Sequence, residues 1–538
     1  MVFDAFAFQE ALALVLRPET LMWLALGVTL GVGVGAMPGL TTSTGLALFL
    51  PLTFGMDTAN ALGLLIGLYK GSIWGGSISA ISFATPGAPD SAATVYDGYK
   101  LMEKGKGKKA ILVALYSSVT SDFLSDVVTI IAAPLLAIVA LKFGPSEKFW
   151  LMVLAVALLG ALSGAHLAKG MLSAAIGLFI GTVGTDPVAY VERVTFGIWW
   201  LNEGVQLVPL IIGIFAMSRM LEESLKLFIE RKSMGDMQER IKAMFNKGSE
   251  GLTFAEFRSC WKEMVIGFGC GTIIGALPGL GATVAAFVSY SVAKQVSPEK
   301  KIGTGRIEGI AAAEAGNNAT VGPTLIPLLA FGIPGSSAAA LIGAALTLQG
   351  ADPNPRFFSL YPEIVYSLFM ILMLGNAFNL VIGRVFGLLY ARLGQLPREM
   401  LIPLVMMMAI VGSFVYRGEF TDVYVMLFFG FVGFFLRIFG VPEAPLVVTY
   451  MVTPLMEQNI RRALLIEQGS LFHALFTSPL AICLALAAVI LTYLSAKLQV
   501  MERIAHIEEQ DAKERNSAQE ARATAGGNQR RPSDHIDE

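Results

Sequence analysis

The sequence predicts an all-α polytopic membrane protein with about 10–12 spans, built as two inverted-topology repeats whose helices are broken or re-entrant at Pro-Gly motifs. Three observations predict this fold. Apolar residues make up 54% of the 538 residues and charged residues only 15%, whereas a soluble domain has about 25% charged residues. The apolar residues form long blocks, and the Pro-Gly motifs recur at regular separations. Together these features favour an elevator-type transporter.

The apolar blocks are long enough to cross a bilayer. Leu151–Leu162, Val423–Leu436 and Leu480–Leu494 contain no charged residue, and about 20 such residues, counted with their neighbours, span the hydrocarbon core. The net charge of −2 gives no indication of nucleic-acid binding. The sequence also lacks HExxH, Walker A and GxSxG motifs. It therefore predicts neither an ATP-driven pump nor a membrane hydrolase, and we expect no enzymatic activity.

Pro-Gly breaks occur twice in each half of the chain. AMPGLTTST at Ala36–Thr44 resembles ALPGLGATV at Ala276–Val284, and FATPGAPDS resembles FGIPGSSAA. Further segments match in the same order, at separations that rise steadily. Chance matches would scatter, so the pattern indicates two homologous halves. The aligned prolines are Pro38 and Pro278, Pro86 and Pro334, Pro145 and Pro397, and Pro187 and Pro442, at separations of 240, 248, 252 and 255 residues.

The repeat divides the chain into four regions. We expect a first transmembrane repeat at 1–220 and a second at 251–500. The segment 221–250 between them is rich in lysine and arginine, which predicts a cytoplasmic linker. The tail 501–538 mixes both signs of charge and ends in a polar, Gly-containing stretch, which predicts partial disorder.

The placement of basic loops predicts that the two halves have opposite orientations. In the first half the basic loop, Lys100–Lys109, follows the second break. In the second half the basic loop, Lys294–Arg306, lies between the two breaks. Because basic loops face the cytoplasm, equivalent loops of the two halves must face opposite sides of the membrane.

The broken helices predict a binding site for an anion near the middle of the membrane. A half-helix N-terminus presents free N–H groups and a partial positive charge. Carbonyl groups freed at half-helix C-termini suit Na⁺, which gives candidate sites near Pro38, Pro86, Pro278 and Pro334. Proline and glycine also kink membrane helices for packing alone, so a structural role stays open. The candidate substrate-binding residues are Thr41, Thr42, Ser43, Thr44, Thr85, Pro86, Gly87, Asn317, Asn318, Pro334, Gly335, Ser336 and Ser337.

Four acidic residues within the apolar segments are candidates for holding the coupling ion. Asp90 lies in the hydroxyl-rich stretch after the second break, and Glu314 lies among small residues. Asp122 and Asp126 are four residues apart, on one face of a predicted helix. This pair could bind a cation, carry a proton, form a polar patch facing an aqueous cavity, or contact a partner subunit. No cofactor is expected beyond the coupling Na⁺ or H⁺.

Three stretches resemble the large membrane subunit of the tripartite tricarboxylate transporters, the TctA-like family. They are AMPGLTTSTGLALFLPLTFGMD, GLYKGSIWGGSISAISFATPGAPDSAATVYDGYKLMEKGKGKKA and AEAGNNATVGPTLIPLLAFGIPGSSAAALIGAAL. The resemblance implies a multi-pass secondary transporter of the bacterial inner membrane. Its substrate would be a tricarboxylate, a dicarboxylate or an aromatic acid, imported with Na⁺ or H⁺. It also implies a small four-span membrane subunit and a periplasmic substrate-binding protein as partners, and it leaves a homodimer of the membrane complex open.

The chain departs from the pattern of this family at the second break. Family members usually carry Asn at the position of Ala84, and Asp90 falls within the hydroxyl-rich stretch. An additional carboxylate repels an anionic substrate unless it is protonated or paired with a cation. This departure favours an acid smaller or less charged than citrate. Asp122 and Asp126 are also unusual for the family.

Two other functions remain compatible with the sequence. A stand-alone ion-coupled carboxylate carrier would use the same breaks without a binding protein. A membrane scaffold or sensor would act through the cytoplasmic linker and the tail. Mutation of the Pro-Gly breaks separates the last alternative from the two transporters, because only a transporter requires them.

Overall fold

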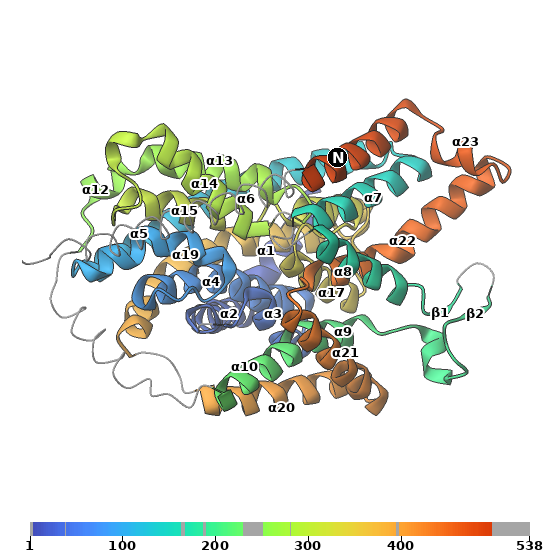
Figure 1. The fold of residues 1–538 in the computed structure, drawn as a ribbon, viewed down its shortest axis with the longest axis horizontal. Helices are drawn as coiled ribbons and strands as arrows, with labels where there is room; N and C mark the ends of the chain where they lie inside the picture. The colour runs from blue at the N-terminus through green and yellow to red at the C-terminus, as the bar shows by residue number, and fades with distance from the viewer. Residues whose placement is uncertain are drawn as a thin grey trace, which may run out of the picture.

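The computed structural model describes residues 4–37, 39–162, 167–186, 190–229, 251–279, 281–393 and 398–497. Nearly all of the regular structure in these ranges is helical (Figure 1). The exception is a two-stranded antiparallel ribbon, β1 (Gly184–Thr185) and β2 (Glu192–Arg193), in which Gly184 pairs with Arg193. The tail from residue 498 and residues 230–250 of the expected linker lie outside the described ranges.

The helices fall into the two halves of the chain that the sequence predicts. The first half contains α1 (Ala5–Val15), α2 (Pro18–Ala36), α3 (Thr42–Phe49), η1 (Leu50–Thr53), α4 (Thr58–Phe83), η2 (Pro89–Ser91), α5 (Ala92–Glu103), α6 (Gly107–Ala140), α7 (Pro145–Leu162), α8 (Leu167–Ile180), η3 (Trp199–Glu203), α9 (Leu207–Ile211), η4 (Ile212–Met217) and α10 (Ser218–Ile229). The second half contains α12 (Phe254–Ser259), α13 (Trp261–Gly275), α14 (Gly281–Val296), η5 (Pro298–Lys300), α15 (Ile307–Asn318), α16 (Leu325–Phe331), α17 (Ser337–Leu348), α18 (Phe357–Leu360), α19 (Pro362–Leu393), α20 (Arg398–Arg417), α21 (Phe420–Ile438), α22 (Ala444–Ile466), α23 (Leu471–Leu475) and a last helix at Pro479–Lys497.

Within the described part of the chain, five helices are long and apolar enough to cross a membrane on their own. Five further apolar helices are shorter. The all-α, multi-pass character predicted from the sequence is therefore confirmed. The count of about 10–12 spans stays a prediction, because the Pro-Gly breaks divide several apolar segments into pieces too short to cross singly. The five long helices are α2, α6, the Pro362–Gly387 part of α19, α21 and Pro479–Lys497.

Helices α2 and α4 pack with their backbones in contact. A Cβ atom added at Gly31 would lie 2.4 Å from the carbonyl oxygen of Leu68, and one added at Gly35 would lie 2.1 Å from that of Ser72. The facing positions increase together along both helices, so the two helices run parallel. Glycine at every fourth position allows this close approach. The stripes are Gly27, Gly31 and Gly35 on α2, and Gly63, Gly67, Gly71 and Gly75 on α4.

Helices α13 and α15 pack in the same way. A Cβ atom at Gly271 would lie 2.4 Å from the carbonyl oxygen of Gly316, and Gly267 and Gly275 make similar close approaches to α15 and the turn that follows it. The contact of Gly271 with Gly316 is the counterpart of the contact of Gly31 with Leu68. Gly271 follows Gly31 by 240 residues, and Gly316 follows Leu68 by 248 residues. These are the separations that the sequence gives for the first and second Pro-Gly breaks.

Replacing Gly271 with alanine is expected to destabilise the protein by about 1–3 kcal/mol, because the new methyl group would meet backbone atoms that cannot move aside. Gly269, two residues earlier on α13, provides the matched control, since a Cβ atom there meets nothing within 4 Å. Gly269→Ala should leave stability unchanged or raise it slightly. Thermal unfolding of the two purified variants in detergent measures the difference. Equal unfolding temperatures would contradict the close packing of α13 on α15.

The two basic loops meet at one end of the molecule. Lys100 donates to the carbonyl oxygen of Gly303 at 2.7 Å, and Lys104 donates to that of Thr304 at 2.6 Å. The buried carboxylate of Asp97 accepts hydrogen bonds from the backbone N–H groups of Gly303, Gly305 and Arg306. A carboxylate that accepts several backbone N–H bonds holds a loop in one conformation. The loops are therefore fixed to each other.

A further ion pair strengthens this basic end. The Lys109 ammonium at the start of α6 lies 2.6 Å from a carboxylate oxygen of Glu256 on α12. The hydrogen bond from Lys109, assisted by those from Thr253, lowers the pKa of Glu256 to about 2. The carboxylate is thus ionised at every physiological pH and ties α12 to α6.

The corresponding non-basic loops meet at the other end. Gln349, after α17, donates to the carbonyl oxygen of Thr53 at 3.1 Å and contacts Thr58 at the start of α4. Helix α4, at 26 residues, is about 39 Å long, and α5 continues in its direction, which places the two ends far apart. Figure 1 shows α5 and α12 at one end of the long axis, and β1, β2 and α23 at the other.

Candidate functional site

The helices end at the Pro-Gly motifs, and the broken ends meet in pairs. In the first half the N–H of Gly39 donates to the carbonyl oxygen of Gly87 at 3.1 Å. In the second half the N–H of Gly279 donates to the carbonyl oxygen of Gly335 at 2.9 Å. Both donors have positive φ angles, +95° and +91°, which glycine adopts at little steric cost. Each half thus joins its first break to its second break by the same bond.

A second pair of bonds repeats as well. The N–H of Gly87 donates to the carbonyl oxygen of Gly76 at 3.4 Å, and the N–H of Gly335 donates to that of Thr324 at 3.2 Å. The accepting carbonyl groups lie within α4 (Gly76), just before α16 (Thr324) and in the second breaks themselves (Gly87 and Gly335). The Na⁺ sites near Pro86, Pro278 and Pro334 stay predictions, since a carbonyl oxygen that accepts one hydrogen bond keeps a second lone pair. Pro38 lies outside the described residues.

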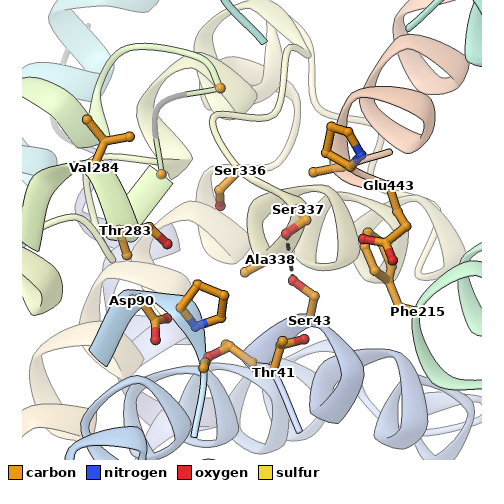
Figure 2. A pocket seen from close by; sticks show the side chains of 18 of the residues that line it. Thr41, Ser43, Asp90, Phe215, Thr283, Val284, Ser336, Ser337, Ala338 and Glu443 are labelled. Carbon is orange, nitrogen blue, oxygen red and sulfur yellow. Dashed lines mark hydrogen bonds between the residues drawn. The ribbon is translucent and has the colours of Figure 1, made fainter. Parts of the chain in front are cut away.

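A cavity of about 450 Å³ lies between the breaks of the two halves (Figure 2). Thr41, Thr42 and Ser43 line it from the first half, and Ser336 and Ser337 line it from the second. Further lining comes from α7, from η4 and from the segment between α21 and α22. A volume of this size suits a small organic molecule.

Four helices begin at this cavity: α3, α14, α17 and α22. The hydroxyl of Thr41 accepts from the N–H of Thr44, and the hydroxyl of Ser336 accepts from the N–H of Ala339. These caps satisfy one N–H group each and leave the other first-turn N–H groups of α3 and α17 for a ligand. The hydroxyls of Ser43 and Ser337 lie 2.6 Å apart and bond to each other across the cavity, as Figure 2 shows.

Six of the predicted site residues line the cavity: Thr41, Thr42, Ser43, Asp90, Ser336 and Ser337. The others lie outside its lining. Thr44 is buried behind it and donates to the carbonyl oxygen of Phe215, while the side chain of Thr85 is exposed. The remaining predicted residues outside the lining are Pro86, Gly87, Asn317, Asn318, Pro334, Gly335, Glu314, Asp122 and Asp126.

Sequence reasoning missed three polar residues that line the cavity: Tyr69, Arg437 and Glu443. The guanidinium of Arg437 lies 2.5 Å from a carboxylate oxygen of Glu443, so the charges of these two groups offset each other. The hydroxyl of Tyr69 bonds to that of Thr324 at 3.2 Å. The one signal for Arg437 in the sequence is its position at the end of an apolar segment. Arginines at a membrane interface commonly have this position, so it does not single out a residue of the cavity.

Asp90 brings a carboxylate to the cavity wall without a cation beside it. Its side chain is buried, and it accepts a weak hydrogen bond of 3.4 Å from the hydroxyl of Ser91. No ion pair involves Asp90 within the described ranges. A bound proton or a cation would therefore be needed to offset this charge when an anion occupies the cavity.

Glu314 lies at a junction of three helices. Its carboxylate accepts hydrogen bonds from Ser77 on α4 at 2.5 Å, from Thr94 on α5, and from Ser118 on α6 at 3.0 Å. The side chain is fully buried. The three hydroxyl donors reduce the desolvation penalty of the carboxylate, although they supply no positive charge.

Asp122 and Asp126 share a buried lysine that the sequence analysis did not single out. The ammonium of Lys70 on α4 lies 2.8 Å from a carboxylate oxygen of each aspartate on α6. Asn376 on α19 accepts from Lys70 at 3.3 Å and donates to Asp126 at 2.6 Å. All four side chains are buried. One lysine and two aspartates leave the cluster with a formal charge of −1 when all three are ionised.

The sequence comparisons agree with this architecture. The model of the tripartite tricarboxylate transporter TctA family matches residues 21–448. The chain is 33% identical over 483 residues to an uncharacterized 52.8 kDa protein in the TAR-I ttuC' 3' region of Agrobacterium vitis, covering 89% of this chain and 94% of that protein. It is 34% identical over 228 residues to an uncharacterized protein in the TAR-II ttuC' 3' region of the same organism, covering 42% of this chain and 94% of that protein. The chain therefore belongs to the tripartite tricarboxylate transporter TctA family, and it is a transporter component rather than an enzyme, as the sequence predicted.

Proposed function

We propose that this chain is the transport subunit of a binding-protein-dependent secondary transporter that imports an organic carboxylate. The observation that carries the proposal is the cavity at which four helices begin. The N-termini of α3 and α17 face each other there, with the hydroxyls of Ser43 and Ser337 between them. Two N-termini and several hydroxyls bind a carboxylate without a free lysine or arginine in the site.

The arrangement of the halves supports an inverted repeat. The bond from Gly39 to Gly87 has its counterpart in the bond from Gly279 to Gly335. The basic loop after the second break of one half contacts the basic loop between the breaks of the other. The non-basic loop after the second break of the second half likewise contacts the non-basic loop between the breaks of the first half, through Gln349 and Thr53. Two inverted repeats around one site give a transporter two related conformations, one open to each side, and an elevator-type movement is the form we propose.

Import against a gradient requires a coupled ion, and three buried acidic groups are suited to hold it. Asp90 lies at the cavity, Glu314 lies behind it, and the cluster of Lys70 with Asp122 and Asp126 has a formal charge of −1. A proton or Na⁺ at any of these groups would remove an uncompensated negative charge from the membrane interior. The proposed coupling ion is therefore Na⁺ or H⁺.

The family assigns partners to such a subunit. Tripartite transporters combine a large membrane subunit with a small membrane subunit and a periplasmic substrate-binding protein. We propose that this chain works with one of each in the bacterial inner membrane, the basic loops facing the cytoplasm. A homodimer of the membrane complex is compatible with the same function.

Uptake of radiolabelled acids tests the proposal. Vesicles would contain this chain with its small subunit, and citrate, succinate and benzoate would represent the three substrate classes. Uptake driven by an imposed Na⁺ or H⁺ gradient and dependent on the binding protein is the expected result. Uptake that ignores the binding protein would favour a stand-alone carrier. If correctly inserted protein imports none of the acids, the cavity serves some other ligand.

A further inference from the structure

A second cavity, of about 210 Å³, opens next to the second break of the second half. Phe331 and Ile333 line it from that break, and Lys148 and Arg462 line it from α7 and α22. Its rim includes Pro353 and its neighbours, from the loop that follows α17. That loop lies at the end of the molecule opposite the basic loops, because Gln349 contacts Thr53 and Thr58 there.

The cavity carries positive charge that the described residues offset only in part, through Glu147. Lys148 is half-buried, and neither Lys148 nor Arg462 forms an ion pair within the described ranges. The charges of Arg462 and of the nearby Arg356 repel that of Lys148, whereas the carboxylate of Glu147 attracts it. Its neighbour Glu147 accepts a hydrogen bond of 2.5 Å from Ser478. Two positive charges that line one cavity make its electrostatic potential more positive, and this attracts an anion.

The same structural elements line both cavities. Helix α7 contributes Met152 to the outer cavity and Leu159 to the central one. Helix α22 contributes Leu455 to the outer cavity and begins at the central one. At 1.5 Å per residue, the separation between the two along these helices is about 10–15 Å. The segment after α16 passes from Ile333 at the outer cavity to Ser336 at the central one.

We propose that the outer cavity is a receiving site for the carboxylate on its way to the central cavity, with Lys148 and Arg462 as its cationic ligands. This inference rests on the proposed function, since it needs an anionic substrate that enters from the side opposite the basic loops. Basic residues are normally sparse on the outer side of a membrane protein. Lys148 and Arg462 form no ion pair within the described ranges, and they lie beside elements that also line the central cavity. Passage of an anionic substrate explains why two cations are placed there.

Transport by variants of the two cations tests the inference. In vesicles supplied with the binding protein and a limiting concentration of radiolabelled succinate or citrate, Lys148→Met combined with Arg462→Gln should lower the initial uptake rate about tenfold, because removal of two charges near an anion weakens its capture. At saturating substrate the rate should stay within about twofold of the wild type, because the central cavity is intact. Lys148→Arg keeps the charge and should retain wild-type uptake.

Lys142→Met is the matched control, since Lys142 is exposed and lines neither cavity. If the wild type imports the acid and the double variant imports it at the same initial rate at limiting substrate, the receiving site is overturned and the proposed function stands. Failure of the wild type to import any acid would overturn the proposed function itself. A second measurement uses Lys148→Cys and a membrane-impermeant thiol reagent added from outside. Labelling at this position, slowed by succinate or citrate, supports the site; labelling only from the cytoplasmic side contradicts it.

Discussion

Replacement of Lys70 with methionine is expected to destabilise the protein by about 3–5 kcal/mol, the largest effect on stability that the described contacts predict. The ammonium of Lys70 lies 2.8 Å from the carboxylates of both Asp122 and Asp126. All three groups are buried, so water cannot take the place of the lysine. The substitution keeps most of the side-chain volume and leaves two aspartates without a cation. Thermal unfolding in detergent, together with the yield of folded protein, measures the loss.

The control for Lys70→Met removes the negative charges of the two aspartates together with the positive charge of the lysine. Lys70→Met combined with Asp122→Asn and Asp126→Asn leaves no buried charge in the cluster, and it should recover a substantial part of the lost stability. This triple variant also separates stability from transport. If the cluster holds the coupling proton, the triple variant folds but no longer accumulates substrate against a gradient. A single Lys70→Met variant as stable as the wild type would contradict the ion pairs.

Replacement of Ser337 with aspartate is expected to lower uptake about 100- to 1,000-fold while the protein remains folded. Ser337 is the first residue of α17 and lies at the cavity. A carboxylate there repels a bound carboxylate by about 4 kcal/mol at 4 Å, with an effective dielectric constant of 20. Aspartate is favourable in the first turn of a helix, because it interacts with the helix dipole. Stability should therefore be maintained, and the loss of uptake reports on the sign of the substrate's charge.

Ser337→Asn provides the matched comparison, since it changes the size of the side chain in a similar way without adding charge. It should retain uptake within about tenfold of the wild type, through loss of a hydroxyl contact alone. Radiolabelled uptake with the same binding protein, together with unfolding temperatures of both variants, completes the experiment. Equal uptake by the aspartate and asparagine variants would rule out an anionic group of the substrate near the start of α17.

Much of the fold could be predicted because its signals are local in the sequence. Proline and glycine mark the ends of α2 and α4 directly, and the regular separation of the motifs anticipates the paired bonds of Gly39 with Gly87 and of Gly279 with Gly335. Hydroxyl residues after a break occupy the first turn of the next helix. For this reason the sequence places Ser43 and Ser337 at a candidate site, although nothing in it indicates the contact between them.

The parts that could not be predicted depend on contacts between distant segments. Lys70 lies 52 residues before Asp122 and 306 residues before Asn376, and a single sequence does not pair them. A lone lysine inside a long apolar helix was a signal in its own right, because such residues are expensive in a membrane. Arg437 and Glu443 line the cavity because α21 packs on η4 and α10 and because α22 packs on α7 and α8, which are contacts between distant segments. The sequence does not fix the number of spans for a related reason: the length of an apolar segment does not show how far a broken helix crosses the membrane.

The glycine contact between α2 and α4 has a mechanical consequence. Where the carbonyl oxygens of Leu68 and Ser72 touch the glycines of α2, no side chain lies between the two backbones. Such an interface has no rotamers to rearrange and no void to compress. The pair therefore resists sliding or bending of one helix against the other. We therefore expect α2 and α4 to move together as one rigid unit during transport, with the deformation located in the loops that join this pair to the rest of the protein.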